Sequence, residues 1–376
     1  MNHDTDIAPY TDHDVPAVIN HLLDDPDFID AVGKFRLKGW YPWLKPFVVE
    51  RIRAAVRKRT AHINTIAAFQ SALEPLLADI LSQTTETFTV SGLEHLDANE
   101  AYLFLSNHRD IAMDPAFVNW ALYSGGFETV RIAIGDNLVQ KAFVGHLMRL
   151  NKSFIVKRDV SGPREMLKTY SALSNYIRDS LDTGHPVWIA HREGRAKDGI
   201  DRTDPAILKM LSMAGKTRQE TFQTALQALR IVPVSISYEF DPCAPLKARE
   251  LAVTERDGQY VKGANEDIHS IATGIMGWKG RVHLHFGAII EDVPDTPAAL
   301  AQYIDHHIAL GQKVFDTGRL ADAMLNQVSQ PLDLMPDVAQ RFTRLIAKTP
   351  RQYQTKLLEI YANPFRQFTL HQERKL

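Results

Sequence analysis

The sequence predicts an α/β fold: a largely parallel or mixed sheet flanked by helices, with helical additions at both ends of the chain. Short apolar segments of strand length begin near residue 86 and alternate with stretches of helical period. Helix-like sequence precedes this part, over residues 15–82, and follows it after about residue 297. Strands separated by helices favour parallel pairing, because a crossover helix returns the chain to the end of the sheet where the previous strand began.

This alternation sets the boundaries of three expected regions. They are a helical N-terminal region over residues 1–85, an α/β domain over residues 86–296 and a helical C-terminal region over residues 297–376. A chain of 376 residues can bury a large core in one such domain. The expected strands lie at 101–106, 130–134, 153–157, 187–190, 231–238 and 281–288. A long helix is expected from Pro163, because proline is favoured in the first turn.

Charge is distributed unevenly in the N-terminal region. Residues 1–30 hold eight aspartates and no Lys or Arg, whereas residues 34–59 hold nine Lys or Arg and a single acid. A helix from Pro46 to Thr60 is expected to carry part of this basic cluster, and the aromatic segment 39–43 lies just before it. Aromatic side chains beside a basic amphipathic helix suit the headgroup zone of an anionic membrane. The alternative is a solvated basic face on a helix that packs on the core.

A histidine and an aspartate near the end of the first apolar strand are the leading candidates for chemistry. His108 follows the run 101–105, and Asp114 stands just before an expected helix. An imidazole held by a carboxylate is a ready general base for a hydroxyl nucleophile. Asp110 is the alternative partner for His108. Asp114 can also cap a helix whose first residue is Pro115, and the two roles are compatible.

Three further short motifs follow in chain order. They are Phe154–Arg158, Arg192–Arg195 and Val232–Tyr238. Lys157 and Arg158 end a strand-like run, and adjacent basic residues at a strand end are able to bind a phosphate, with Arg as a fork and Lys as a point charge.

Taken together, the four segments resemble the glycerolipid acyltransferase family, which acylates glycerol 3-phosphate or 1-acylglycerol 3-phosphate. That family carries an Asn-His motif with a downstream Asp, then Phe-Ile-x-Arg, Glu-Gly-x-Arg and Val-Pro-Val blocks. The order and rough spacing match over residues 100–240. Five residues separate His108 from Asp114, one more than the family's usual four, so Asp114 aligns with the family aspartate through a one-residue insertion.

The resemblance implies two catalytic roles in the first block and a phosphate-binding role in the second. His108 would remove the proton from the acceptor's hydroxyl as that oxygen attacks the acyl thioester. Asp114 would fix the imidazole tautomer and stabilise the imidazolium that forms. Lys157 or Arg158 would bind the acceptor phosphate, and Arg158 is favoured for its forked geometry.

The same resemblance assigns the last two blocks. Glu193, counted with the catalytic residues, would orient the loop or the acceptor hydroxyls. Gly194 would let the backbone approach closely. Arg195 or Lys197 would take the part of the block's arginine in substrate binding, and Pro233 would shape the wall of the acyl site.

No metal site is predicted. His283 and His285 lie two residues apart in an alternating segment, without an apparent third ligand, and are interpreted as one polar face of an edge strand. The lone cysteine, Cys243, excludes an intramolecular disulfide and any cysteine-rich metal site.

The resemblance therefore implies an O-acyltransferase of phospholipid synthesis, with acyl-CoA or acyl carrier protein (acyl-ACP) as co-substrate and no other cofactor. The preferred acceptor is the lysophospholipid 1-acylglycerol 3-phosphate, with glycerol 3-phosphate close behind. A hydrolase that uses the same His/Asp pair with water is one rival class. A non-catalytic, membrane-bound scaffold on the same fold is another.

Composition restricts partners and location. A net charge of −2 argues against a general nucleic-acid binder, and the lone cysteine favours a reducing compartment. No apolar run approaches the roughly 20 residues that cross a bilayer, and the acidic N-terminus is unlike a secretory signal. We expect a cytoplasmic protein, peripheral on the inner face of the cell membrane.

Overall fold

A computed structural model describes residues 7–139, 141–158, 160–263, 265–329 and 333–373. Contacts group the chain into two compact units. The first contains the residues up to Ala78 together with 131–173, and the second contains residues 79–130 and everything from Ser174 onward. The three regions expected from the alternation of strand-like and helical sequence, 1–85, 86–296 and 297–376, stay a prediction.

Helices dominate the first unit. Its elements are α2 (Val15–Asp24), α3 (Pro26–Leu37), α4 (Tyr41–Thr60), the first part of α5 (Ile66–Thr84), β3 (Arg131–Gly135), α7 (Ala142–Leu150), β4 (Ser153–Val156) and the first part of α8 (Pro163–Asp182). β3 and β4 pair in parallel. Apolar side chains spaced three and four residues apart on α2, including Val15, Ile19 and Leu22, pack with Phe69 of α5 and Leu150 of α7. The start of α8 at Pro163 confirms the helix expected there.

The helix expected over residues 46–60 is longer than the sequence predicted. It begins at Tyr41, so Pro46 lies inside it and not at its start. Pro42 occupies the first turn, where a proline loses no helical hydrogen bond, and the helix is therefore able to begin upstream of Pro46.

The second unit is built on a mixed sheet, which confirms the predicted fold class. Its strands are β1 (Thr87–Ser91), β2 (Leu103–Ser106), β5 (Val187–Ala190), β6 (Ile231–Tyr238) and β7 (Arg281–Phe286), in the order β1-β7-β6-β2-β5. β6 and β7 are antiparallel, and the other neighbours in this order are parallel.

The strand β1 was not among the strands expected from the sequence. Its five residues, Thr87 to Ser91, are half-exposed or exposed and include three hydroxyl side chains, so they form no apolar run. The strands that were expected have buried residues along most of their length, as β2 and β6 show.

The parallel strands β2, β5 and β6 place three candidate segments at one edge of the sheet. Leu105 of β2 lies opposite Ile189 of β5 and Pro233 of β6 in the register. The carboxyl ends of parallel strands meet at the same edge, which is where functional groups gather in α/β folds. His108 and the loop after Ala190 therefore leave the sheet on the same side.

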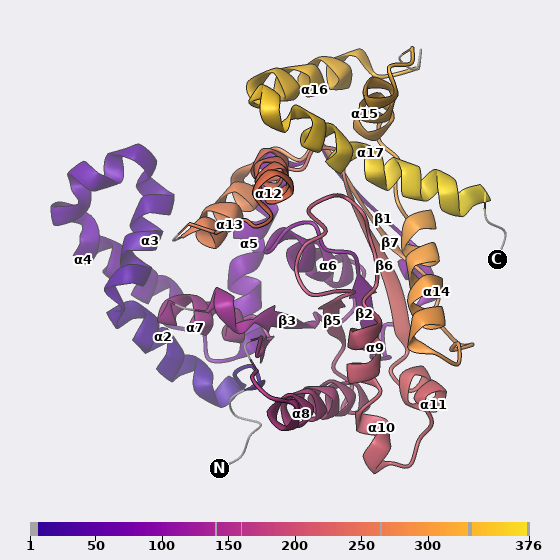
Figure 1. Cartoon of the computed structure of the whole chain (residues 1–376). Helices are drawn as coiled ribbons and strands as arrows, with labels where there is room; N and C mark the ends of the chain where they lie inside the picture. The colour runs from indigo at the N-terminus through magenta and orange to yellow at the C-terminus, as the bar shows by residue number, and fades with distance from the viewer. Residues whose placement is uncertain (1–6, 140, 159, 264, 330–332, 374–376) are drawn as a thin grey trace. The chain divides into compact units, whose positions relative to one another are not determined.

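Helices surround this sheet and make up the C-terminal part of the chain, as predicted. They are α6 (Met113–Ser124), the second part of α8, α9 (Pro205–Leu211), α10 (Ala214–Thr217), α11 (Phe222–Gln227), α12 (Ala244–Asp257), α13 (Glu266–Met276), α14 (Pro297–Leu310), α15 (Asp316–Asn326), α16 (Pro336–Lys348) and α17 (Arg351–Glu373). α17 packs on α12, α14 and α15 (Figure 1). Its buried residues Leu357 and Tyr361 share a cluster with Phe342 of α16.

Candidate functional site

His108 and Asp114 form a direct pair at the carboxyl end of β2. The Nδ1 atom of His108 lies 2.8 Å from Oδ2 of Asp114. The His108 side chain is 14% exposed, whereas that of Asp114 is fully buried. Because a carboxylate only accepts hydrogen bonds, the proton of a neutral imidazole here belongs on Nδ1, which leaves Nε2 as the basic nitrogen.

Four donors surround the Asp114 carboxyl. Oδ2 accepts hydrogen bonds from His108, from the backbone N–H of Arg109 at 2.5 Å and from that of Asp110 at 2.9 Å. Oδ1 accepts one from the Tyr238 hydroxyl at 2.7 Å. Burial alone would raise the pKa of this carboxyl, but the bonds from His108 and the other donors outweigh burial and lower it. Asp114 therefore remains an ionised acceptor beside the imidazole.

Asp110, the alternative partner, has another role. Its Oδ1 accepts hydrogen bonds from the backbone N–H groups of Ala112 and Met113, at 3.0 and 2.8 Å, where α6 begins. Asp114 is not the N-cap, because α6 begins at Met113, one residue before Asp114 and two before Pro115, and Ala112 occupies the N-cap position. Asp114 lies in the first turn and is free to face His108.

The two neighbours of His108 are tied to one buried acid, Asp201. Its Oδ2 accepts hydrogen bonds from Nδ2 of Asn107 at 3.0 Å and from the Arg109 guanidinium at 2.6 Å. Asn107 also bonds to both backbone groups of Ile236 in β6. The side-chain amide of Gln367, in α17, bonds to both backbone groups of Asp201. Sequence reasoning missed Asp201, which lies in no motif and meets Asn107 only through the fold.

The segment Glu193–Arg195 follows β5 and is divided between exposed and buried residues. Glu193 is exposed at the turn, and Gly194 adopts a φ of +73°, a conformation that favours glycine. A Cβ on Gly194 would meet no described protein atom within 4 Å, so the positive φ is the feature of this chain that favours glycine here, and a close approach of the backbone to a substrate stays a prediction. Arg195 is buried, and the backbone N–H of the next residue, Ala196, donates to the carbonyl of His108 at 2.8 Å.

Arg195 is a buried cation. Within the described part of the chain it forms no ion pair, whereas Lys197, the alternative, is paired with Glu250. A buried guanidinium without a carboxylate is an available anion-binding group. Of the two candidates for the block's arginine, Arg195 is therefore better suited to bind a substrate anion.

Lys157 and Arg158 belong to the first unit. Both are exposed and follow β4 directly. A Cβ on Gly135, the last residue of β3, would lie 2.4 Å from Nε of Arg158, so the Arg158 side chain crosses the end of β3 next to this glycine. Their assignment to the acceptor phosphate stays a prediction.

The strand β6 contributes two of the residues singled out in the sequence, Pro233 near its start and Tyr238 at its end. Pro233 is buried in the middle of the sheet, opposite Leu105, and its carbonyl accepts a hydrogen bond from Gly287. Tyr238, the last residue of β6, bonds to Asp114 instead. The sequence drew attention to Tyr238 only as part of a structural block, because a tyrosine at a strand end gives no sign of its partner.

The pair His283 and His285 lies on β7, which is an internal strand between β1 and β6. The edge-strand interpretation was wrong because β1, missed in the sequence, covers this side. The rings bond to hydroxyls on β1: His283 to Thr89 and Ser91, and His285 to Ser91. Across the described residues, no group of three or more His, Cys, Asp or Glu is placed to hold a metal ion.

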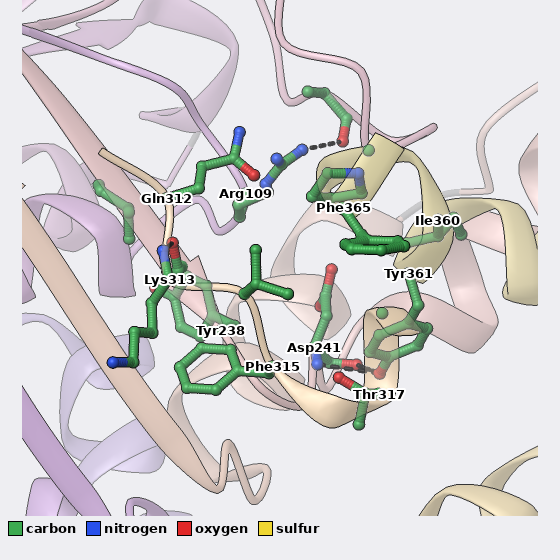
Figure 2. A pocket seen from close by; sticks show the side chains of 17 residues that line it. Arg109, Tyr238, Asp241, Gln312, Lys313, Phe315, Thr317, Ile360, Tyr361 and Phe365 are labelled. Atoms are coloured by element: carbon green, nitrogen blue, oxygen red, sulfur yellow. Dashed lines mark hydrogen bonds between the residues drawn. The ribbon is translucent and has the colours of Figure 1, made fainter. Parts of the chain in front are cut away.

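A cavity of about 60 Å³ lies next to the site, between the end of β6 and α17 (Figure 2). Arg109 and Tyr238 contribute to its wall on the side of the site. Tyr361 and Phe365 of α17 line the facing wall.

Comparison with known proteins finds similarity to acyltransferases over the part of the chain that holds the site. Residues 87–237 match the family described as Acyltransferase. Glycerol-3-phosphate acyltransferase of Pseudoalteromonas translucida (strain TAC 125) is 27% identical over 205 residues, which cover 54% of this chain and 22% of that protein. Dihydroxyacetone phosphate acyltransferase of Bos taurus is 24% identical over 228 residues, which cover 60% of this chain and 32% of that protein. The chain thus spans about a third or less of the length of these relatives.

The chain also resembles solved structures. The 1-acyl-sn-glycerophosphate (LPA) acyltransferase PlsC of Thermotoga maritima matches with a TM-score of 0.36 and 14% identity, over 74% of this chain and 91% of that chain. Among the helices of the described residues, none has both the length and the apolar character of a membrane span.

Proposed function

We propose that this chain, whose residues 87–237 match the Acyltransferase family, transfers an acyl group from a thioester to a hydroxyl of a phosphorylated glycerol acceptor. The observation that carries the proposal is the bond between His108 and the buried, ionised Asp114. A base held in this way suits the activation of an alcohol at neutral pH.

The reaction proceeds in one transfer step. Nε2 of His108 takes the proton of the acceptor hydroxyl as that oxygen attacks the thioester carbonyl. Asp114 stabilises the imidazolium, the C–O bond forms, the C–S bond breaks, and the imidazolium proton passes to the leaving thiolate. Cys243 is a poor candidate for an acyl-enzyme nucleophile, because burial raises the pKa of its thiol to about 12.

Cationic side chains favour a phosphorylated acceptor over a neutral one. Arg195 supplies a buried guanidinium close in sequence to the Ala196 N–H that supports the His108 loop. Lys157 and Arg158 supply exposed charges after β4. We propose 1-acylglycerol 3-phosphate as the acceptor and acyl-CoA or acyl-ACP as the donor. Glycerol 3-phosphate is the second candidate, which the name of the Pseudoalteromonas translucida relative favours.

An assay of purified protein with labelled acyl-CoA or acyl-ACP tests this function. We expect acylation of one or both phosphorylated acceptors and little product from the same acceptors without phosphate. In Arg158→Ala, the KM for the phosphorylated acceptor is expected to rise about 10- to 100-fold, the effect of losing a charged hydrogen-bonded contact. Lys157→Ala is the matched control, since it removes a neighbouring exposed charge that cannot bind a phosphate in the two-pronged way of a guanidinium. The KM of this variant for the acceptor should rise less.

Each rival gives a different result in the same assay. Release of free fatty acid at the same rate without an acceptor would identify a hydrolase. Absence of any product with every donor and acceptor would favour a non-catalytic scaffold. Equal use of acceptors with and without phosphate would remove the role assigned to Arg158.

The chain also presents a surface suited to a membrane. Trp40, Trp43, Leu44 and Phe47 recur at positions one and two turns apart, on one face of the chain as it enters α4. Trp40, Trp43 and Phe47 are 74%, 81% and 75% exposed. We call these four residues the aromatic face.

Charge indicates the partner of the aromatic face. The last turn of the same helix carries Arg57, Lys58 and Arg59, all exposed. Exposed rings at the start of a helix and cations in its last turn match a bilayer with anionic headgroups, where each basic residue near the surface contributes about 1 kcal/mol. We therefore propose that the protein is cytoplasmic and binds the inner face of the cell membrane through α4, where a lipid acceptor is found.

Vesicle sedimentation tests this surface. The double variant Trp43→Ala/Phe47→Ala is expected to lower partitioning onto phosphatidylglycerol-containing vesicles by at least about tenfold, because it removes two aromatic anchors. Trp278→Ala, which removes a half-exposed tryptophan from the second unit, serves as the control and should bind as the wild type does. Equal binding of the wild type, the double variant and Trp278→Ala would contradict the proposal. So would a wild type that binds purely zwitterionic vesicles as well as it binds phosphatidylglycerol-containing ones.

A further inference from the structure

We propose that Tyr238 is a positioning residue for the reaction, whose hydroxyl holds Asp114 in the orientation and the ionised state that brace His108. The inference rests on the proposed function. It assigns to the end of β6 a role in the chemistry and not only in the sheet.

The two oxygens of Asp114 have separate sets of partners. Oδ2 receives the His108 ring and two backbone N–H groups of its own loop. Oδ1 receives the Tyr238 hydroxyl, at 2.7 Å, the one donor to this oxygen in the described part of the chain. Tyr238 therefore determines whether the second oxygen of a buried carboxylate has a donor.

Burial makes this donor important. The Asp114 side chain is fully buried, and a carboxylate oxygen taken out of water without a hydrogen bond disfavours the charged form. A neutral Asp114 would stabilise the imidazolium much less than a carboxylate does. If the Asp114 carboxyl instead rotated so that Oδ1 found another donor, Oδ2 would move as well, and the hydrogen bond to His108 would lose its geometry.

The surroundings of Tyr238 keep its hydroxyl in the donor state. Burial, followed by the nearby carboxylates of Asp114, Asp110 and Asp241, raises the pKa of Tyr238 well above its usual value. The ring is held by an edge contact with Phe117 of α6, with centroids 5.8 Å apart. Phe117 and Asp114 both belong to α6, so the helix that packs against the Tyr238 ring also carries the acid to which the Tyr238 hydroxyl bonds.

The cavity next to the site provides a matched control. Tyr238 and Tyr361 both line it, and both are largely buried (Figure 2). The Tyr361 hydroxyl accepts a hydrogen bond from the backbone N–H of Asp241 at 3.0 Å, and no contact joins it to Asp114. Tyr→Phe at either position removes one hydroxyl from a residue that lines this cavity, but only the Tyr238 hydroxyl bonds to Asp114.

The experiment compares Tyr238→Phe and Tyr361→Phe, each alone and combined with Asp114→Asn. We expect Tyr238→Phe to lower kcat about tenfold with little change in KM, since a hydrogen bond to a charged group is lost away from the substrate. Tyr361→Phe should keep kcat within about twofold. In the Asp114→Asn background, the effect of Tyr238→Phe should fall to about twofold or less, because no carboxylate remains to be held. Thermal unfolding of every variant shows that each protein is folded.

A second readout does not depend on turnover. The Nδ1 proton of His108, hydrogen-bonded to Asp114, should give an NMR signal that shifts in Tyr238→Phe and stays in place in Tyr361→Phe. Equal kcat for the two phenylalanine variants with an unshifted signal would overturn the role of Tyr238. An inactive wild type in which the signal still responds to Tyr238→Phe would overturn the proposed function and leave the Asp114 contact in place.

Discussion

His108→Ala is expected to lower kcat for acyl transfer by at least about 10³-fold while the protein stays folded, because the variant lacks the general base. The carboxyl of Asp114 keeps its two backbone donors and Tyr238 in this variant, so no buried charge loses all its partners. The ring's other contact is an edge approach to Trp188, with centroids 5.7 Å apart. Initial rates at saturating donor and acceptor measure the effect.

A surface histidine supplies the control. His185→Ala removes a ring that is 39% exposed and pairs with Glu128 on the surface, and its kcat should equal that of the wild type. More than about a tenth of wild-type kcat in His108→Ala would show that another group takes the hydroxyl proton.

Much of the fold was predictable because the buried strands have a clear apolar pattern. β2, β5 and β6 consist of buried residues over nearly their whole length. A short apolar run of this kind, bounded by turns, is typical of a buried strand. β1 differs, because three of its five residues carry hydroxyl side chains and none of the five is buried. Its pairing with β7 depends on register with a strand almost two hundred residues away.

The pairing of His108 with an acid was predictable from the sequence, but the residues that hold this pair in place were not. His108 and Asp114 are six residues apart, so one turn of loop brings them together, and the sequence limited the partner of His108 to two acids. Asp201 and Tyr238 reach this loop from 92 and 124 residues away. Contacts of that kind follow from the sheet order, which a single sequence does not specify.

Asp114→Asn is expected to lower kcat by about 10²- to 10⁴-fold while the geometry of the site is preserved. The asparagine carbonyl can take the place of Oδ2 and accept from His108, Arg109 and Asp110, and the amide can then face Tyr238, whose hydroxyl is able to turn and accept. The tautomer of His108 is thereby retained, and the rate loss reports the missing charge. Steady-state kinetics with thermal unfolding of the same samples separates this loss from misfolding.

Asp114→Ala provides the contrast, because it removes the acceptor as well as the charge. The Arg109 and Asp110 N–H groups, the Tyr238 hydroxyl and the His108 ring would all lose their common partner, and each buried donor left unpaired costs about 1–3 kcal/mol. We therefore expect a clearly lower melting temperature for the alanine variant than for the asparagine variant. If Asp114→Asn instead transferred acyl groups at the wild-type rate, the carboxylate would serve only to hold the loop, and the imidazolium would need no buried counter-charge.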